Sequence, residues 1–400
     1  MDLATVNLWD LDQFVPRVPH ELFAELRKHP PYWQDEAGGP GFWNFTRYDD
    51  VVVVNKDNLT FSSSRGTALI NEMPIEQIEQ QRLMMLNMDP PIHTRYRLLV
   101  NKGFTPRMVG QLEASIRERT RSIIAAARDR GAFDFVTDVA AELPLQVIAD
   151  LMGVPQEDRH RVFDWSNRMV GSEDPEYQGA PEEAQLASME LFAYCHALTE
   201  QKKADPHEDL MSILTRVELD GERLNELEID LFFMLLAVAG NETTRNLIAH
   251  GMLALLEHPD VYRELLADRS LVPGAVEEML RFGSPVMHFR RTATRDTDIN
   301  GFPVREGDKL VIWYISANRD ETVFADPSRF DIRRDPNPHV AFGGGGPHFC
   351  LGANLARLEI RVMFEEVLSL LPDIEQAGPA ARLRSNFING IKHLPVRIAS

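Results

Sequence analysis

One long helix, expected from about residue 225 to 257, constrains the fold more than any other feature of the sequence. At about 1.5 Å per residue, it would cross a domain built from 400 residues. Its middle, Leu231 to Gly240, is apolar on every side, which is typical of a helix buried all round. We therefore expect other elements to pack around it.

Six polar residues, Asn241 to Asn246, follow that apolar stretch directly. Burying polar side chains is costly unless they are paired or face water, and Gly240 is a poor helix former at the same place. A buried polar patch beside a small residue in mid-helix indicates a functional site. A hydrogen-bond cluster between helices is the structural alternative, and the pattern leaves both open.

Helical periodicity dominates from about residue 105 to 280. An example is the apolar series at every fourth position from Val139 to Leu151, which Gly153 ends. A polar stretch with Gly and Pro, residues 171–181, is expected to be a surface loop between two such helices.

Period-two patterns with turn signals predict short strands near both ends of the chain. We expect strands at 31–34, 42–46, 61–64 and 308–316, and a final hairpin over 383–398 around Asn389-Gly390. The expected fold class is mainly α with a small β region, in one interleaved domain, 1–400. Its β-rich parts are about 30–65 and 291–317 with 383–398, and its helical core is about 88–282 and 350–371.

Charge and cysteine content exclude several classes of protein. With 42 basic and 61 acidic residues the net charge is −19, which argues against general nucleic-acid binding and against anionic membranes. The longest apolar run, 231–240, is about half of the ~20 residues that a spanning helix needs, and the first ten residues show no signal-peptide pattern. We expect no membrane anchor and, with two cysteines, a reducing cytoplasm.

The segment Phe342-Gly-Gly-Gly-Gly-Pro-His-Phe-Cys350-Leu-Gly is the most informative motif. Four glycines let a backbone pass close to something flat and bulky. An amphipathic helix follows, so the Cys350 thiol lies near a helix N-terminus, where the dipole favours a thiolate. A lone cysteine is most often a small buried hydrophobe, and a glycine-rich turn before a helix can cradle an anion. A single explanation must account for the phenylalanine, the glycines, the histidine, the cysteine and the helix together.

At this point the sequence resembles the cytochrome P-450 family, whose haem-binding signature is matched by Phe342, Gly343, His348, Cys350 and Gly352. The resemblance implies the mainly helical P-450 fold and a haem b cofactor (heme b, iron protoporphyrin IX) whose iron is bound by Cys350. A thiolate in that position donates electron density that favours O–O cleavage.

A second motif, Glu278-x-x-Arg281, has its two charges at i, i+3 on a helix. By base rates such a pair is a solvated contact. In the P-450 family it is buried and joins an arginine of a later segment, for which Arg329 is expected here. The implied role is structural support of the cysteine loop.

Ala239-Gly240-Asn-Glu242-Thr243 resembles the family's oxygen-activation motif. The resemblance implies that Glu242 and Thr243 act as an acid–alcohol pair, with Ala239 and Gly240 beside the haem. A hydroxyl next to a carboxylate can hold water and relay protons.

The resemblance assigns His93, Arg97, Arg291 and His348 to the haem propionates. Arginine suits planar carboxylates, and histidine can donate a hydrogen bond. His93 and Arg97 are an i, i+4 pair that would ordinarily face solvent. Arg290 is the rival of Arg291, which the following Thr-Ala spacing favours.

The implied activity is insertion of one oxygen atom from O2 into a C–H bond of a hydrophobic steroid, terpenoid or branched or fatty lipid. Electrons would come from NAD(P)H through a ferredoxin and a ferredoxin reductase to a monomeric enzyme. A peroxide-dependent haem hydroxylase and a non-catalytic haem or lipid carrier are the alternatives. Family positions imply a substrate pocket lined by Leu235, Val238, Ala239, Val286, Met287 and Ile388.

Overall fold

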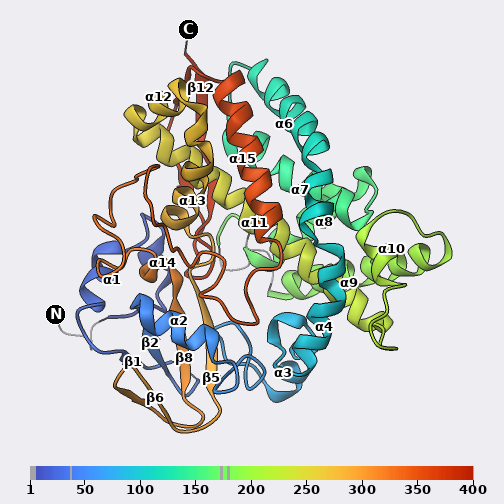
Figure 1. The fold of residues 1–400 in the computed structure, drawn as a ribbon, viewed down its shortest axis with the longest axis vertical. Coiled ribbons are helices and arrows are strands. Elements are labelled where there is room, and N and C mark those ends of the chain that lie inside the picture. Colours follow the sequence, from blue (N-terminus) through green and yellow to red (C-terminus); the bar gives the residue numbers. More distant parts are fainter. Residues whose placement is uncertain (1–5, 37, 172–173, 178–180, 400) are drawn as a thin grey trace.

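Helices make up most of the computed structural model, and most of the short strands lie to one side of the long helices (Figure 1). The structure describes residues 6–36, 38–171, 174–177 and 181–399. The helices are α1 (His20–Leu26), α2 (Tyr48–Lys56), α3 (Ile75–Gln81), α4 (Ile92–Val100), α5 (Pro106–Gln111), α6 (Glu113–Arg128), α7 (Glu142–Met152), α8 (Arg159–Val170), α9 (Pro181–Ala204), α10 (Leu210–Leu214), α11 (Glu226–Glu257), α12 (Pro259–Ala267), α13 (Val272–Gly283), α14 (Tyr314–Ala317) and α15 (Ala353–Leu370).

Short strands gather mainly on the side of the N-terminal segment (Figure 1). They are β1 (Tyr32–Gln34), β2 (Phe42–Phe45), β3 (Phe61–Ser62), β4 (Ala132–Asp134), β5 (His288–Ala293), β6 (Thr297–Ile299), β7 (Phe302–Val304), β8 (Lys309–Trp313), β9 (Ile374–Gln376), β10 (Ala381–Arg382), β11 (Ile391–His393) and β12 (Pro395–Ile398). The mainly α class with a small β region is confirmed.

The long helix predicted over 225–257 is α11. A capping box starts it, in which the Asn225 side chain accepts from the Glu228 N–H and the Glu228 carboxylate accepts from the Asn225 N–H. Helices α7, α8, α9, α13 and α15 all pack against it. The apolar middle is therefore buried from several directions, and Phe233 is 0% exposed.

The largest sheet has the order β1-β2-β8-β5-β3. Strand β2 pairs in parallel with β8, so that Phe45 lies opposite Ile312, and β3 pairs with β5, so that Phe61 lies opposite Ala293. These two pairings join segments that are more than 200 residues apart in the sequence.

Three expectations for local structure are wrong in detail. The tail forms not one hairpin but two pairings, because β11 pairs with β10 across Gly390 whereas β12 crosses to β4 and β9. The helix through Val139 begins as a π-helical segment, Val136–Ala140, before α7. Helix α2 interrupts the β-rich region expected over 30–65.

The loop expected at 171–181 lies between α8 and α9, partly outside the described residues.

Candidate active site: a cavity between α11 and the cysteine loop

A large cavity separates α11 from the loop that carries Cys350. Helix α4 and strand β5 supply other parts of its wall. Most of the residues singled out in the sequence line it, namely His93, Arg97, Leu235, Ala239, Gly240, Thr243, Val286, Arg291, Phe342, Gly343, His348 and Cys350.

Four of the expected site residues are absent from this lining among the residues that the structure describes: Val238, Glu242, Met287 and Ile388. Met287 packs instead in the core beneath the N-terminal segment. Ile388 forms an isolated β-bridge with Val286 and so lies beside a lining residue. Adjacent positions on a helix or strand face different directions, which explains why only some neighbours of Leu235 and Val286 reach the cavity.

Cys350 presents its accessible surface to the cavity. Its backbone N–H donates to the Phe342 carbonyl at 2.9 Å, which closes the loop just before α15. Burial raises the pKa of the Cys350 thiol, whereas the Gly352 N–H, Arg97 and Arg357 act in the opposite direction. Desolvation thus outweighs the Gly352 N–H and the two arginines in the protein alone, and a metal ion bound to the sulfur would favour the thiolate.

The four glycines of this loop serve two purposes. A Cβ on Gly343 would meet no atom nearer than 3.8 Å, and this residue lines the cavity. By contrast, a Cβ on Gly346 would come within 2.2 Å of the Asn55 carbonyl, and Gly346 has φ +80°. The close approach expected from the sequence is therefore partly an approach to helix α2.

Two histidines and two arginines meet at one side of the cavity. The rings of His93 and His348 lie 4.2 Å apart, and burial lowers the pKa of both, to about 4 for His93. A neutral imidazole can donate one hydrogen bond, and the His348 Nε2 lies 3.1 Å from the Met88 carbonyl, which can accept it. Arg291 is 4% exposed, and Arg290 beside it pairs with Glu72 at 2.9 Å. Alternation along β5 thus directs Arg291 alone into the cavity.

This group of residues fits the carboxylates of a haem. Neither Arg97 nor Arg291 forms an ion pair with any described residue, and neither ring nitrogen of the buried His93 has a hydrogen-bond partner. Buried charges and polar atoms are costly unless they are paired. An anionic group at this edge of the cavity would satisfy them, with the Cys350 thiol available to its metal.

On the opposite side, Thr243 faces the cavity from α11, and its hydroxyl donates to the Ala239 carbonyl at 2.8 Å. Gly240 lines the same wall, and a Cβ there would lie 2.8 Å from the Ile148 side chain of α7. Gly240 therefore lets two helices approach closely as well as leaving room in the cavity.

Glu242 points away from the cavity because successive residues of a helix are rotated by about 100°. Its carboxylate is 2% exposed and pairs with Arg245, whose other nitrogen donates to Asn167 of α8 at 3.1 Å. Burial raises the pKa of Glu242, and Arg245 opposes that rise. The acid–alcohol pair expected from the sequence thus faces two different sides of α11.

The Glu278–Arg281 pair is buried, with both side chains 0% exposed. Two hydrogen bonds of 2.6 and 2.8 Å join it. The expectation for Arg329 is wrong, because its exposed side chain lies outside the cluster and only its carbonyl accepts from Arg281, at 3.0 Å. The arginine of this later segment whose side chain contacts Glu278 is Arg334, at 3.2 Å.

Sequence reasoning missed several residues of this site. Arg245 was available as a partner at i+3 from Glu242, a spacing typical of helical ion pairs. Glu359 of α15, which also lines the cavity, is 3% exposed, and burial raises its pKa to about 8. No sequence pattern indicated that this glutamate lacks a cation.

Comparisons with known proteins identify the family. The family described as Cytochrome P450 matches residues 182–371. The steroid C26-monooxygenase of Rhodococcus jostii (strain RHA1) is 46% identical over 397 residues, which cover 97% of this chain and 83% of the relative. The chain belongs to the cytochrome P450 family. As a cytochrome P450, it is a haem-thiolate monooxygenase that uses O2.

Two further relatives of this cytochrome P450 support the same family assignment. The methyl-branched lipid omega-hydroxylase of Mycobacterium tuberculosis (strain ATCC 25618 / H37Rv) is 44% identical over 99% of this chain and 94% of its own length. The solved structure of a Mycobacterium marinum cytochrome P450 in complex with pseudoionone has a TM-score of 0.89 at 40% identity, covering 95% of this chain and 94% of that one. No helix among the described residues combines the length and apolar character needed to traverse a bilayer.

Proposed function

We propose that the chain binds haem b in the cavity, with Cys350 as the iron ligand and His93, Arg97, Arg291 and His348 around the propionates. The unpaired cations and unpartnered imidazole support this assignment. When bound, the haem supplies the oxidising chemistry with O2. Phe342 and Gly343 would support its cysteine side, and Ala239 and Gly240 its opposite side.

Two residues of α11, Thr243 and Glu242, are proposed to deliver the protons that the reaction consumes. The Thr243 hydroxyl, which lines the cavity, positions water at the reacting side. Glu242 can deliver protons only through water or side-chain motion, because its carboxylate faces α8 and is held by Arg245. Glu278, Arg281 and the backbone of Arg329 act on structure and touch neither substrate nor cofactor.

The substrate is proposed to be a steroid or a branched or fatty lipid, hydroxylated at a C–H bond. The relatives named for C26 and omega oxidation support this class, as does an apolar wall that includes Leu235, Val286, Phe232 and Phe289. A terpenoid is the second candidate, and the relative solved with pseudoionone favours it. Electrons are proposed to come from NAD(P)H through a ferredoxin and its reductase.

Three further features are proposed: one domain, a monomer, and a cytoplasmic location. The first is supported by a sheet that pairs residues 61–62 with 292–293.

A peroxide-dependent hydroxylase would not need the Thr243 hydroxyl in the cavity, and a carrier would need neither that hydroxyl nor reducing partners.

The observation that carries the proposal is the position of Cys350 in the same cavity as Arg97 and Arg291, which donate to backbone carbonyls but form no ion pair with a described residue. The test is the carbon monoxide spectrum of the reduced, haem-loaded protein, where thiolate ligation gives a Soret band displaced to long wavelength. Cys350→Ser should abolish that displacement, whereas Cys195→Ser, at the other, fully buried cysteine, should retain it. A wild-type band without the displacement would overturn the assignment.

A spectral-shift titration with steroids, methyl-branched lipids and terpenoids then selects the substrate. Product formation with ferredoxin, ferredoxin reductase and NAD(P)H separates the monooxygenase from the two alternatives, because a carrier gives none and a peroxide-dependent enzyme does not need the partners.

A further inference from the structure

Helix α4 carries two of the residues assigned to the haem propionates, His93 and Arg97, and both contact the cysteine loop. The centre of the His93 ring lies 4.2 Å from that of His348, and the Arg97 Nη2 donates to the Phe349 carbonyl. The reach of these two side chains depends on where α4 itself lies. The contacts that fix α4 are therefore part of how this edge of the cavity is built.

The opposite side of α4 presents Arg95, two positions after His93. Two residues of a helix are rotated by about 200°, so these side chains point in opposite directions. Arg95 donates from Nε to the Glu222 Oε2 at 2.6 Å, from Nη1 to the Glu228 Oε1 at 2.9 Å, and from Nη2 to the Arg223 carbonyl at 2.6 Å. A planar guanidinium suits several acceptors at once, whereas a lysine ammonium acts as a point charge.

Tyr96, the next residue of α4, contacts the same end of α11. Its side chain is 0% exposed, and its hydroxyl donates to the Glu228 carbonyl. The centre of the Tyr96 ring lies 6.1 Å from that of Phe232, which lines the cavity that contains Cys350. The Glu228 Oε2 accepts from the Asn225 N–H at 2.8 Å in the capping box. Arg95 and Tyr96 thus join α4 to the first turn of α11.

The contact between Arg95 and Glu228 is partly shielded from water. The two side chains are 31% and 18% exposed, whereas that of Glu222 is 60% exposed. Fully exposed ion pairs contribute little, because water and salt screen them. The contact with Glu228 is therefore the one expected to hold α4 most firmly.

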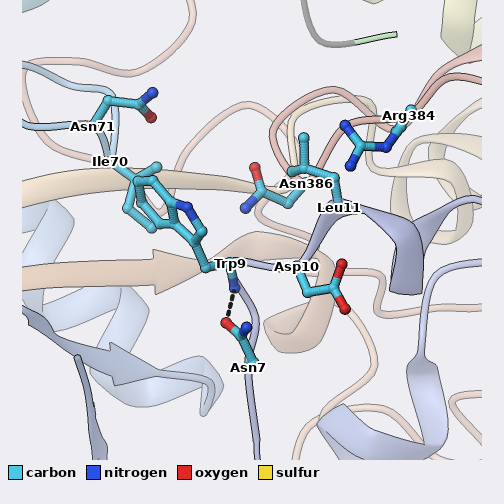
Figure 2. Close-up of a pocket in the computed structure, with 8 residues that line it drawn as sticks. All are labelled: Asn7, Trp9, Asp10, Leu11, Ile70, Asn71, Arg384 and Asn386. Atoms are coloured by element: carbon cyan, nitrogen blue, oxygen red, sulfur yellow. Dashed lines mark hydrogen bonds between the residues drawn. The ribbon is translucent and has the colours of Figure 1, made fainter. Parts of the chain in front are cut away.

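A second cavity, formed by segments 7–11, 70–71 and 384–386, lies elsewhere in the molecule (Figure 2). None of its described lining residues belongs to α4 or to the first turn of α11. Helix α4 is therefore held by its own contacts rather than by the wall of that cavity.

We propose that Arg95 and Tyr96 are positioning residues for the haem. They hold α4 against the first turn of α11, so that His93 and Arg97 stay at the propionates. This inference rests on the proposed function, and Arg95 acts through α4 because it faces away from His93. Without these contacts the propionates lose part of the positive charge that balances them. Uncompensated negative charge disfavours an added electron, so the reduction potential of the iron becomes more negative.

The experiment uses the haem-loaded protein and four variants. Arg95→Met removes three hydrogen bonds, Arg95→Lys keeps the charge, and Tyr96→Phe removes only the hydroxyl. The matched control is Arg223→Met, because the exposed Arg223 side chain pairs with Glu218 at 2.6 Å and the carbonyl that accepts from Arg95 remains. The measurements are the rate of haem transfer to excess apomyoglobin, the reduction potential of the iron and the urea midpoint.

We expect Arg95→Met to transfer haem about tenfold faster than wild type, equivalent to ~1.4 kcal/mol, and to have a more negative reduction potential. Arg95→Lys should recover part of both changes, because it keeps a charge near Glu228. Tyr96→Phe should change both in the same direction by less. Arg223→Met should match wild type in both.

A wild-type reduction potential in Arg95→Met overturns the proposal even if the urea midpoint falls, because a merely structural contact lowers stability alone. Haem transfer no faster than in Arg223→Met also overturns it. If Arg95→Met retains no haem, unchanged potentials in both Arg95→Lys and Tyr96→Phe overturn it instead. Failure of the proposed function is a separate result, because it appears in the carbon monoxide spectrum of the wild-type preparation.

Discussion

The two sides of the cavity that contains Cys350 differ in how completely the polar groups behind them are satisfied. Behind the cysteine loop, the Glu278 carboxylate accepts from Arg281, Arg334, Asn337 and the Asp331 N–H. On α11, the Asn241 Oδ1 and the Arg245 Nε are buried and have no partner among the described residues.

This difference indicates that the charges behind the cysteine loop have a structural role, whereas those on α11 take part in the reaction. A closed network of charges has one low-energy arrangement and stabilises a loop whether or not a ligand is present. A network with open positions depends on water, ligand or motion to complete it, as expected where protons must move. We expect substitutions on the cysteine side to change stability and those on α11 to change the course of the reaction.

The largest effect should come from Arg281→Met, which leaves the Glu278 carboxylate buried with fewer cations. Removing one partner of a buried ion pair typically costs about 3–5 kcal/mol of unfolding free energy. The matched control is Arg329→Met, in which the exposed side chain changes but the carbonyl that accepts from Arg281 remains. Chemical denaturation should give a change below about 0.5 kcal/mol for the control. Equal losses in both variants would contradict the closed network.

Two buried atoms on the cysteine side have no partner among the described residues, the Oδ1 of Asn337, whose Nδ2 donates to Glu278, and the Oε2 of Glu359. Of the two residues, Glu359 is the acid, and its carboxyl is buried. Its pKa of about 8 means that the folded protein keeps a proton that the unfolded chain loses near pH 4.5. Stability should therefore fall as pH rises through this interval, by roughly 2 kcal/mol between pH 6 and 8.

Glu359→Gln should remove this dependence while keeping the shape of the side chain. The measurement is the urea midpoint of both proteins at pH 6, 7 and 8. Parallel curves would show that Glu359 is already ionised in the fold, with a partner that completes the network.

The sequence predicted the elements that carry these two walls better than the direction of their side chains. Periodicity located α11 within one residue at its N-terminus, and the motif around Cys350 indicated the cavity. Arg329 and Arg334 both lie in the segment after α14, and only the path of that irregular chain decides which of them turns inward.

Contacts between distant segments explain the remaining errors. The glycines at 343–346 signalled a close approach, but not that helix α2 would be one of the neighbours. Likewise, adjacent acid and alcohol residues at 242 and 243 suggested one relay, although a helix must direct them to different sides. Short-range patterns predict where a residue lies, whereas its partners depend on tertiary packing.

On the α11 wall, Thr243→Ala should leave haem bound and stability nearly unchanged, because the hydroxyl forms just one hydrogen bond with a described residue, to the Ala239 carbonyl. We expect product per NAD(P)H to fall about tenfold, with the missing reducing equivalents recovered as hydrogen peroxide, since a proton-relay group contributes at least this much. Thr243→Ser, which keeps the hydroxyl, should restore most of the coupling. Undiminished coupling in the alanine variant would remove the assignment of Thr243.

The smallest effect should come from Arg245→Met, which tests whether the pair behind α11 is an open relay or a second scaffold. Without the cation, only the weaker influence of Ser166 opposes burial at Glu242, so its pKa should rise and its carboxyl should keep the proton to higher pH. We expect product formation to slow about fivefold, equivalent to ~1 kcal/mol, and the pH–rate profile to move to higher pH. Arg245→Lys, which keeps a charge within reach, should return the profile toward wild type. The unfolding free energy should fall on either reading, because a buried carboxylate loses its cation, so the pH–rate profile decides: a purely structural pair would leave that profile in place. The buried ion pairs on the two sides of the cavity would then both have a structural role.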